Sequence, residues 1–288
     1  DLVLTAILAN GHVLIEGVPG VAKTLLARLT ARLIDADFSR VQFTPDLMPS
    51  DVLGTTVFNM KTNGFDFHQG PIFADIVLVD EINRAPAKTQ AALFEVMEER
   101  QISIDGTTHR MGDLYTILAT QNPVEQEGTY KLPEAQLDRF LMKITMDYPS
   151  LEEEVNILER HHTNAALVKL DDITPAITKE ELLSLRAFMN QVFVDRTLLQ
   201  YIALIVQQTR TSKAVYLGAS PRASVAMLQS SKAYALLQGR DFVTPEDIKF
   251  VAPYVLQHRL ILTAEAEMEG YSPVKVTQRL IDKVEVPK

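Results

Sequence analysis

A glycine-containing loop near the start of the chain lies between a short β-prone run and a helical one. The loop is Gly17-Val18-Pro19-Gly20-Val21-Ala22-Lys23-Thr24; it follows the strand pattern of His12–Glu16 and precedes the helical pattern of Leu25–Ile34. A strand, a loop and a helix in this order aim successive backbone N–H groups and the positive end of the helix dipole at one point. The segment therefore predicts a phosphate-binding site of the P-loop type.

Within this loop, we expect Lys23 to reach the β- and γ-phosphates of a nucleotide and the Thr24 hydroxyl to bind Mg²⁺. Ala22 stands where the common pattern has a second glycine. Because alanine disfavours a positive φ, we expect Ala22 to lie already on the helical turn. The residues predicted to contact the nucleotide are Gly17, Val18, Pro19, Gly20, Val21, Ala22, Lys23, Thr24 and Leu25.

Strand-like and helical patterns alternate through the first half of the chain, which predicts a parallel sheet covered by helices. Ile76–Val79 is apolar at every position, as expected of a central strand that is buried on both faces. The five expected strands are His12–Glu16, Arg40–Phe43, Ile76–Val79, Tyr115–Thr120 and Leu141–Met146.

Polar residues follow two of these expected strands. Asp80 and Glu81 come directly after Ile76–Val79, at the edge where parallel sheets place their ligands. Asp80 is a candidate Mg²⁺ ligand, and Glu81 a candidate general base that polarises the attacking water. Asn122 follows Tyr115–Thr120 and is a candidate for orienting that water, although Asn122-Pro123 is also an ordinary turn signal.

Two segments interrupt the alternation of strand-like and helical patterns, and a helical pattern replaces it in the second half of the chain. Val57–Phe67 and Gln101–Met111 have the turn residues of β-hairpins, and insertions of this kind engage other molecules or are tolerated surface hairpins. After Pro149 the pattern is helical, with helix-start signals at Ser150, Thr178 and Thr244. We therefore predict a nucleotide-binding core over 1–149 and an α-helical lid over 150–288.

Two arginines are candidate phosphate contacts. Arg139 lies in a short helical segment, where spacing alone favours a structural salt bridge with Asp138 over a finger that points at another molecule. Arg222 follows Ser220-Pro221, a helix-start signal, and so places a cation in a first helical turn, where the dipole disfavours it. An arginine at that end predicts an anion site.

The overall composition limits the classes of function. The 288 residues are 47% hydrophobic and 23% charged, with no apolar run near the roughly 20 residues that a membrane span needs. The net charge of -9 opposes general attraction to nucleic acid, and the absence of cysteine removes disulfides and thiol chemistry. We expect a cytoplasmic protein. The chain begins at Asp1 inside an apolar helical pattern, so further residues are expected upstream.

Several of these motifs together resemble those of AAA+ ATPases, and the exact residues within them resemble the MoxR branch. The resemblance rests on the Gly17–Thr24 loop with its Ala22, Asp80-Glu81-Ile82-Asn83-Arg84-Ala85-Pro86, Thr120-Gln121-Asn122-Pro123, Gly128-Thr129-Tyr130, Leu132-Pro133-Glu134-Ala135-Gln136, Leu137-Asp138-Arg139-Phe140 and Gly218-Ala219-Ser220-Pro221-Arg222. It covers nearly the whole chain.

The resemblance implies an α/β fold, the P-loop NTPase αβα sandwich with a parallel five-stranded sheet in the order 5-1-4-3-2, followed by an α-helical lid. It implies a homo-hexameric ring that binds ATP with Mg²⁺ between subunits. Asn122 is then sensor 1, Arg139 a finger that acts on the neighbouring subunit, and Arg222 sensor 2. The implied work is chaperone-like remodelling or maturation of protein complexes, with a protein client and often a partner that carries a von Willebrand A domain.

Three other functions stay open at this stage. A magnesium-chelatase motor subunit shares the inserts and the ATP chemistry, but its motifs match less well than those of MoxR. A DNA-remodelling motor needs basic hairpins, whereas Gln101–Met111 has only His109 and Arg110, and Val57–Phe67 only Lys61. A scaffold that binds ATP but barely hydrolyses it fits poorly with the presence of Glu81, Asn122 and Arg139.

Overall fold

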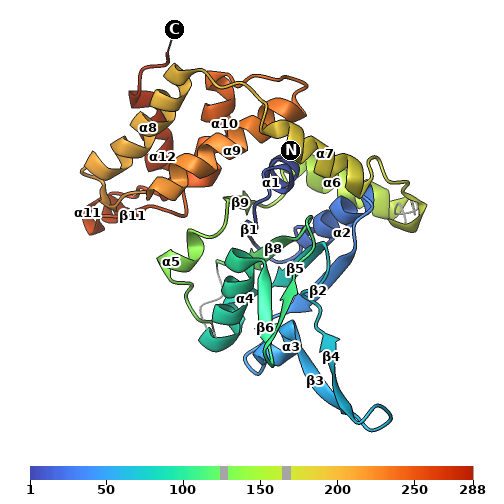
Figure 1. Ribbon diagram of the computed structural model, residues 1–288. Helices are drawn as coiled ribbons and strands as arrows, with labels where there is room; N and C mark the ends of the chain where they lie inside the picture. Colours follow the sequence, from blue (N-terminus) through green and yellow to red (C-terminus); the bar gives the residue numbers. More distant parts are fainter. Residues whose placement is uncertain (124–128, 164–169, 288) are drawn as a thin grey trace. The chain divides into compact units, whose positions relative to one another are not determined.

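The computed structural model describes residues 1–123, 129–163 and 170–287. The described chain divides into two compact units that interleave along the sequence (Figure 1). The sheet unit comprises Leu14–Lys131 and Thr145–Leu182, and the helical unit comprises Asp1–Val13, Leu132–Ile144 and Leu183–Lys288. The predicted division into 1–149 and 150–288 stays a prediction. Gly128, one residue of the motifs quoted above, lies outside the described residues.

A five-stranded parallel sheet is the framework of the site. Its strand order is β2-β5-β8-β1-β9, which confirms the predicted order 5-1-4-3-2 when the expected strands are numbered along the chain. Each observed strand lies within two residues of its predicted bounds. The strands are β1 (Val13–Gly17), β2 (Phe38–Gln42), β5 (Ile76–Asp80), β8 (Thr116–Gln121) and β9 (Met142–Met146).

Strand β5 is buried at every position, as its uninterrupted apolar sequence predicts. It pairs in parallel with β2 on one side, with Gln42 opposite Asp80, and with β8 on the other, with Val79 opposite Ala119. Parallel strands in this register end together. The polar residues that follow them therefore meet at the carboxyl edge of the sheet.

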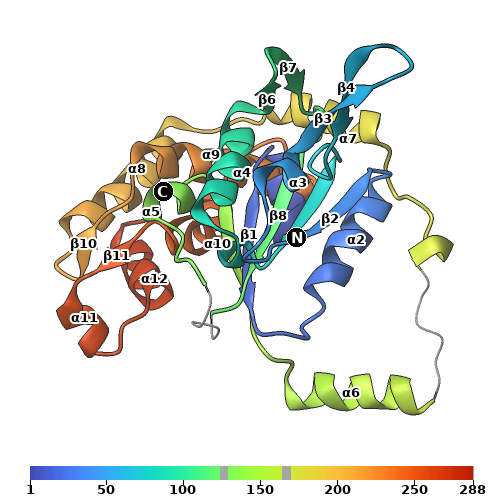
Figure 2. The ribbon, with the colours of Figure 1, turned by 90° about the horizontal axis from the view of Figure 1, so that it is seen from below.

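Helices cover both faces of the sheet within the sheet unit. Helix α2 (Lys23–Leu33) begins directly after the glycine loop, and α4 (Ala87–Glu99) lies on the opposite face (Figure 2). The buried side of α4 is apolar and includes Leu93, Phe94 and Met97. The remaining helical elements of this unit are α3 (Pro49–Leu53), η1 (Ile82–Arg84), α6 (Leu151–His162), η2 (Leu170–Asp172) and the first residues of α7 (Lys179–Met189).

Two antiparallel hairpins project from the same end of the sheet unit, as the turn residues predict (Figures 1 and 2). The first pairs β3 (Gly54–Asn59) with β4 (Gly64–Gln69), and the second pairs β6 (Gln101–Ile104) with β7 (Thr107–Arg110). The first hairpin exposes several large apolar side chains, including Met60 at 88% and Phe65 at 73%. Such side chains in the open signal a contact surface.

The helical unit packs amphipathic helices around an apolar core that includes Tyr201, Met227 and Val251. Its capping is explicit: Thr244 and Asp247 form a reciprocal capping box at the start of α10. The helix starts expected at Ser150 and Thr178, which belong to the sheet unit, are also observed. The helical unit contains α1 (Leu2–Leu8), α5 (Glu134–Leu137), α8 (Arg196–Thr211), β10 (Val215–Leu217), α9 (Pro221–Leu237), α10 (Pro245–Leu256), β11 (Ile261–Leu262), α11 (Ala264–Met268) and α12 (Pro273–Lys283).

Among the residues that the structure describes, none of the helices combines the length and the apolar character that crossing a bilayer requires.

Candidate active site

The glycine loop connects β1 to α2 at the carboxyl edge of the sheet. Gly17 is the last residue of β1, and Lys23 is the first residue of α2. The half-buried Lys23 folds back over the loop, and its Nζ donates to the Gly17 carbonyl oxygen at 2.7 Å. The ammonium group is therefore held at the mouth of the loop, where a phosphate group would lie against the N-terminus of α2.

Ala22 corrects one expectation from the sequence. It adopts the left-handed conformation, with φ 57° and ψ 27°, and precedes the first turn of α2. The prediction that it lies on the helical turn was therefore wrong. Gly20 also has a positive φ, of 86°. Left-handed residues in a tight loop bring backbone N–H groups to one side, which is the geometry of an anion-binding nest, and Ala22 adopts it at a cost of about 1 kcal/mol.

Gly17 has a different role from Gly20. A Cβ atom at Gly17 would lie 2.7 Å from the carbonyl oxygen of Met146, at the end of β9, so only glycine allows this approach of the two backbones. A Cβ atom at Gly20 would meet nothing within 4 Å, and its requirement is the positive φ alone. One glycine thus sets the packing of the loop, and the other sets its turn.

Asp80 ends β5 with its carboxylate almost fully buried, at 7% exposure of the residue. Both carboxylate oxygens are occupied: Arg40 Nε donates to Oδ2 at 2.7 Å, and the Thr120 hydroxyl donates to Oδ1 at 2.9 Å. These partners come from β2 and β8, the two strands beside β5. The carboxylate is therefore held in one orientation at the carboxyl edge of the sheet.

Glu81 follows in the left-handed region, with φ 56° and ψ 50°. Its backbone N–H donates to the Thr120 hydroxyl at 3.0 Å, and its carboxylate accepts from Gln42 Nε2 at 2.7 Å. Arg84 Nε lies 3.0 Å from the same carboxylate oxygen. A left-handed glutamate is unusual, since this conformation favours glycine, asparagine and aspartate. Such strain is typical of residues whose direction matters for function.

Asn122 follows β8 and is buried, at 8% exposure. Because β8 lies between β5 and β1 in the sheet, Asn122 stands at the edge between the ends of the strands that carry Asp80 and the glycine loop. The sheet unit therefore brings together the loop, both carboxylates and Asn122.

Arg139 and Arg222 belong to the helical unit and are described within it. Arg139 is half-buried and follows the short helix α5. Arg222 is exposed in the first turn of α9, whose N-cap Ser220 accepts from the Arg222 backbone N–H at 3.2 Å. The helix start that Ser220-Pro221 predicts is thus observed.

Four residues that contact the carboxylates at this edge were given no such role in the sequence analysis: Arg40, Gln42, Arg84 and Thr120. Nothing in the local sequence around these residues indicates a contact with the carboxylates. The pairing of β2 and β8 with β5 brings Arg40, Gln42 and Thr120 to them. One available signal is position, because these residues lie in or next to the last part of a strand, at the edge where open α/β sheets bind their ligands.

The donor atoms at this edge fit magnesium. The Thr24 hydroxyl and the Asp80 carboxylate are hard oxygen ligands, which Mg²⁺ prefers together with water. The carboxylate of the buried Asp80 is held in a fixed orientation by Arg40 and Thr120, as a metal ligand requires. Among residues 1–123, 129–163 and 170–287, no group of three histidine, aspartate or glutamate side chains is arranged to hold a metal ion.

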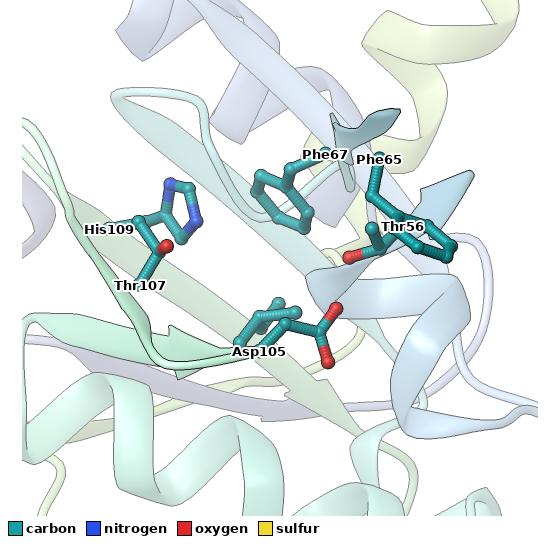
Figure 3. Close-up of a pocket in the computed structure, with 7 residues that line it drawn as sticks. Thr56, Phe65, Phe67, Asp105, Thr107 and His109 are labelled. Carbon is teal, nitrogen blue, oxygen red and sulfur yellow. The ribbon is translucent and has the colours of Figure 1, made fainter. Parts of the chain in front are cut away.

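A groove lies between the two hairpins of the sheet unit, with a volume of about 640 Å³ (Figure 3). Phe65 and Phe67 line it from the first hairpin, and Asp105 and His109 from the second. The Phe67 and His109 rings lie 4.3 Å apart between centroids, so the two hairpins contact each other through this pair.

Comparisons with known proteins agree with this description. The family described as "ATPase family associated with various cellular activities (AAA)" matches residues 12–142, and the AAA lid domain matches residues 207–282. The crystal structure of a candidate ATPase from Cytophaga hutchinsonii is similar, with a TM-score of 0.90 and 42% identity, over 99% of this chain and 88% of that one.

The fold and the phosphate loop, with these matches, define an ATPase of the AAA+ class. Chaperone MoxR1 of Mycobacterium tuberculosis is 44% identical over 297 residues, covering 100% of this chain and 78% of the relative. Protein MoxR of Methylorubrum extorquens is 30% identical over 290 residues, covering 93% and 83%. YeaC of Bacillus subtilis, which carries no functional description, is 48% identical over 286 residues, covering 99% and 88%. The chain belongs to the MoxR family of AAA+ ATPases.

Replacing Lys23 tests the phosphate loop. We expect Lys23→Ala to weaken ATP binding by about 2 to 3 kcal/mol, a factor of roughly 30 to 150 in Kd, because a charged donor to the phosphates is lost. Calorimetric titration with ATP measures the change. Lys88→Ala, which removes an exposed lysine of α4, is the matched control and should bind as the unmodified protein does. Equal affinities of the two variants would contradict the assignment.

Proposed function

We propose that this protein hydrolyses ATP at the interfaces between identical subunits of a hexameric ring and uses the energy to remodel or mature protein complexes. The observation that carries the proposal is the carboxyl edge of the sheet, where a phosphate loop, a fixed carboxylate and a strained glutamate lie at the ends of neighbouring strands. Membership of the MoxR family supports ATP hydrolysis in general.

In this proposal the loop amides and Lys23 bind the β- and γ-phosphates. Thr24 and Asp80 hold Mg²⁺, which would neutralise charge on the phosphates when bound. Arg40 and Thr120 hold Asp80 in one orientation, because both donate to its carboxylate.

Glu81 is the proposed general base, and Asn122 orients the attacking water. In the structure the Glu81 carboxylate is bound by Gln42 and lies beside Arg84. Both donors lie on the same carboxylate oxygen, Oε2, and compete there with the attacking water. Glu81 must therefore exchange these donors for water before it can accept a proton, and the hydrogen bond from Gln42 represents a resting state of the base.

Arg139 and Arg222 supply cations to the phosphates. By family resemblance, Arg139 acts on the ATP of the neighbouring subunit, and Arg222 is sensor 2. An arginine that stabilises charge on the transferred phosphoryl group raises the rate by several orders of magnitude. This part of the proposal requires a ring, because a finger that acts on the ATP of a neighbouring subunit needs that neighbour.

The two hairpins are the proposed contact with the client protein. The first exposes Phe58 and Phe65, and the groove of Figure 3 adds Phe67. Apolar surfaces of this kind bind polypeptide, whereas a nucleic-acid motor needs clustered lysines and arginines. A partner with a von Willebrand A domain is a further proposal that rests on family resemblance. The cytoplasmic location stays a prediction from composition.

Glu81→Gln tests the general base. The amide cannot accept a proton, so we expect turnover to fall by about 10² to 10⁴-fold while ATP binding is kept. Steady-state phosphate release and ATP titration measure the two properties. Glu98→Gln, on α4, is the matched control. A Glu81→Gln variant with near-normal turnover would place the base elsewhere.

Arg139→Ala tests the arrangement in a ring. The pure variant should be inactive, since every site lacks its finger. Mixed with Lys23→Ala subunits, it should regain turnover at those interfaces where the Lys23→Ala subunit supplies a normal Arg139. Phosphate release across a mixing series measures this rescue, and a series that shows none would rule out a finger that acts in trans.

Phe65→Ser tests the client surface. Combined with Glu81→Gln, which should remain in the ATP state, it should reduce the amount of protein that copurifies, because an exposed anchor is lost. Tyr216→Ser is the matched control, since Tyr216 is exposed to a similar extent, at 79% against 73%, but lies in the helical unit. The same yield of copurified protein from both variants would show that the first hairpin does not contact the client protein.

A further inference from the structure

Arg259 is a buried cation just beyond the end of α10, with only 3% of its side chain exposed. Its Nε donates to Asp138 Oδ1 at 2.6 Å, and both residues belong to the helical unit. Neither residue has a role in the function proposed above. Asp138 directly precedes Arg139, however, so this ion pair is built into the segment that carries the proposed finger.

The guanidinium of Arg259 binds the backbone on both sides of Arg139. Its Nη2 donates to the carbonyl oxygen of Asp138 at 3.1 Å and to that of Phe140 at 2.7 Å, while Nη1 donates to the carbonyl oxygen of Leu141 at 3.1 Å and to that of Val255. A planar guanidinium offers five donors in a fixed arrangement, which allows one side chain to fix several successive peptide groups.

The residues before Arg259 extend the same contact. The His258 ring nitrogen Nε2 lies 3.0 Å from the carbonyl oxygen of Phe140, and Gln257 Nε2 donates to that of Lys143 at 2.6 Å. Three consecutive side chains therefore bind four carbonyl groups between Asp138 and Lys143. This density of bonds exceeds what a single surface salt bridge supplies.

The other oxygen of Asp138 connects the segment to helix α9. Ser220 Oγ donates to Asp138 Oδ2 at 3.1 Å and accepts the Arg222 backbone N–H, so one carboxylate joins Arg259 to the N-cap of the helix that carries Arg222. Burial lowers the pKa of Arg259, but a guanidinium stays protonated at neutral pH, and its hydrogen bonds with Asp138 favour the charged form.

We propose that Arg259 is a positioning residue for Arg139: by holding the carbonyl groups on both sides of it, Arg259 sets the direction in which the finger leaves its subunit. This inference rests on the proposed role of Arg139 in trans. It predicts that a change at Arg259 damages the site of the neighbouring subunit and spares the subunit's own site.

The test uses Arg259→Gln in assembled rings. We expect kcat to fall by about 10 to 100-fold in the pure ring, with KM for ATP within about threefold, because misplacing a catalytic group by about 1 Å costs this much. Mixing with Lys23→Ala subunits should then restore turnover, since the latter supply a correctly held Arg139 to the intact sites of the Arg259→Gln subunits. Arg259→Lys keeps the charge but loses the planar guanidinium with its several donors, so it should behave in the same way. It is the variant used if Arg259→Gln does not assemble.

Arg240→Gln is the matched control. Arg240 forms a comparable ion pair with the buried Asp247 within the helical unit, with Nη2 2.5 Å from Oδ1, and is not bonded to the Asp138–Lys143 segment. We expect it to lower the melting temperature while kcat stays within about twofold of the unmodified ring.

The outcomes separate this inference from the proposed function. If Lys23→Ala subunits rescue Arg139→Ala but not Arg259→Gln or Arg259→Lys, Arg259 acts on its own site and the inference is overturned. A kcat of Arg240→Gln that falls as far as that of Arg259→Gln overturns it too, because general loosening of the unit then explains the loss. If even Arg139→Ala is not rescued, the trans finger of the proposed function fails, and the inference fails with it.

Discussion

The buried carboxylate of Asp80 is the constraint on which the nucleotide site depends. It ends a strand with every residue buried, where an ionised group is stable only if its oxygens are satisfied. Arg40 and Thr120 satisfy them from the strands on either side. The same bonds that make the charge tolerable therefore tie together the ends of three neighbouring strands, and the position of Glu81 follows from theirs.

Backbone strain accompanies this arrangement at two places. Ala22 and Glu81 both adopt the left-handed conformation, although neither residue type favours it; Glu81 directly follows β5, and Ala22 ends the glycine loop just before α2. At Ala22 the sharp turn of the backbone directs N–H groups of the loop to one side. At Glu81 it directs the carboxylate to the carboxyl edge of the sheet. The surrounding packing holds these turns, since Gly17 lies against β9 and the Glu81 N–H bonds to Thr120.

The helical unit uses the same physical device for a different purpose. Asp138 is bound by Arg259 and Ser220, and Arg259 in turn binds the carbonyl groups around Arg139. A largely buried ion pair contributes little to stability by itself, because desolvation offsets much of the attraction, but it strongly restricts geometry. Both candidate catalytic regions thus depend on an arginine that binds an aspartate one residue before the functional side chain: Arg40 with Asp80 before Glu81, and Arg259 with Asp138 before Arg139.

The sequence by itself determined the elements, the sheet order through family resemblance, and the loop residues that are proposed to bind phosphate. Uninterrupted apolar runs, turn residues and capping signals act over a few residues, so they can be recognised without the fold. Only the tertiary structure decided the conformation of Ala22, the partners of Asp80 and Glu81, and the hydrogen bonds from Arg259 to the backbone around Arg139. Apart from the Arg84–Glu81 contact, these contacts join residues 39 to 121 positions apart or depend on how a loop is held at both ends. No local pattern encodes which distant donor will meet a given carboxylate.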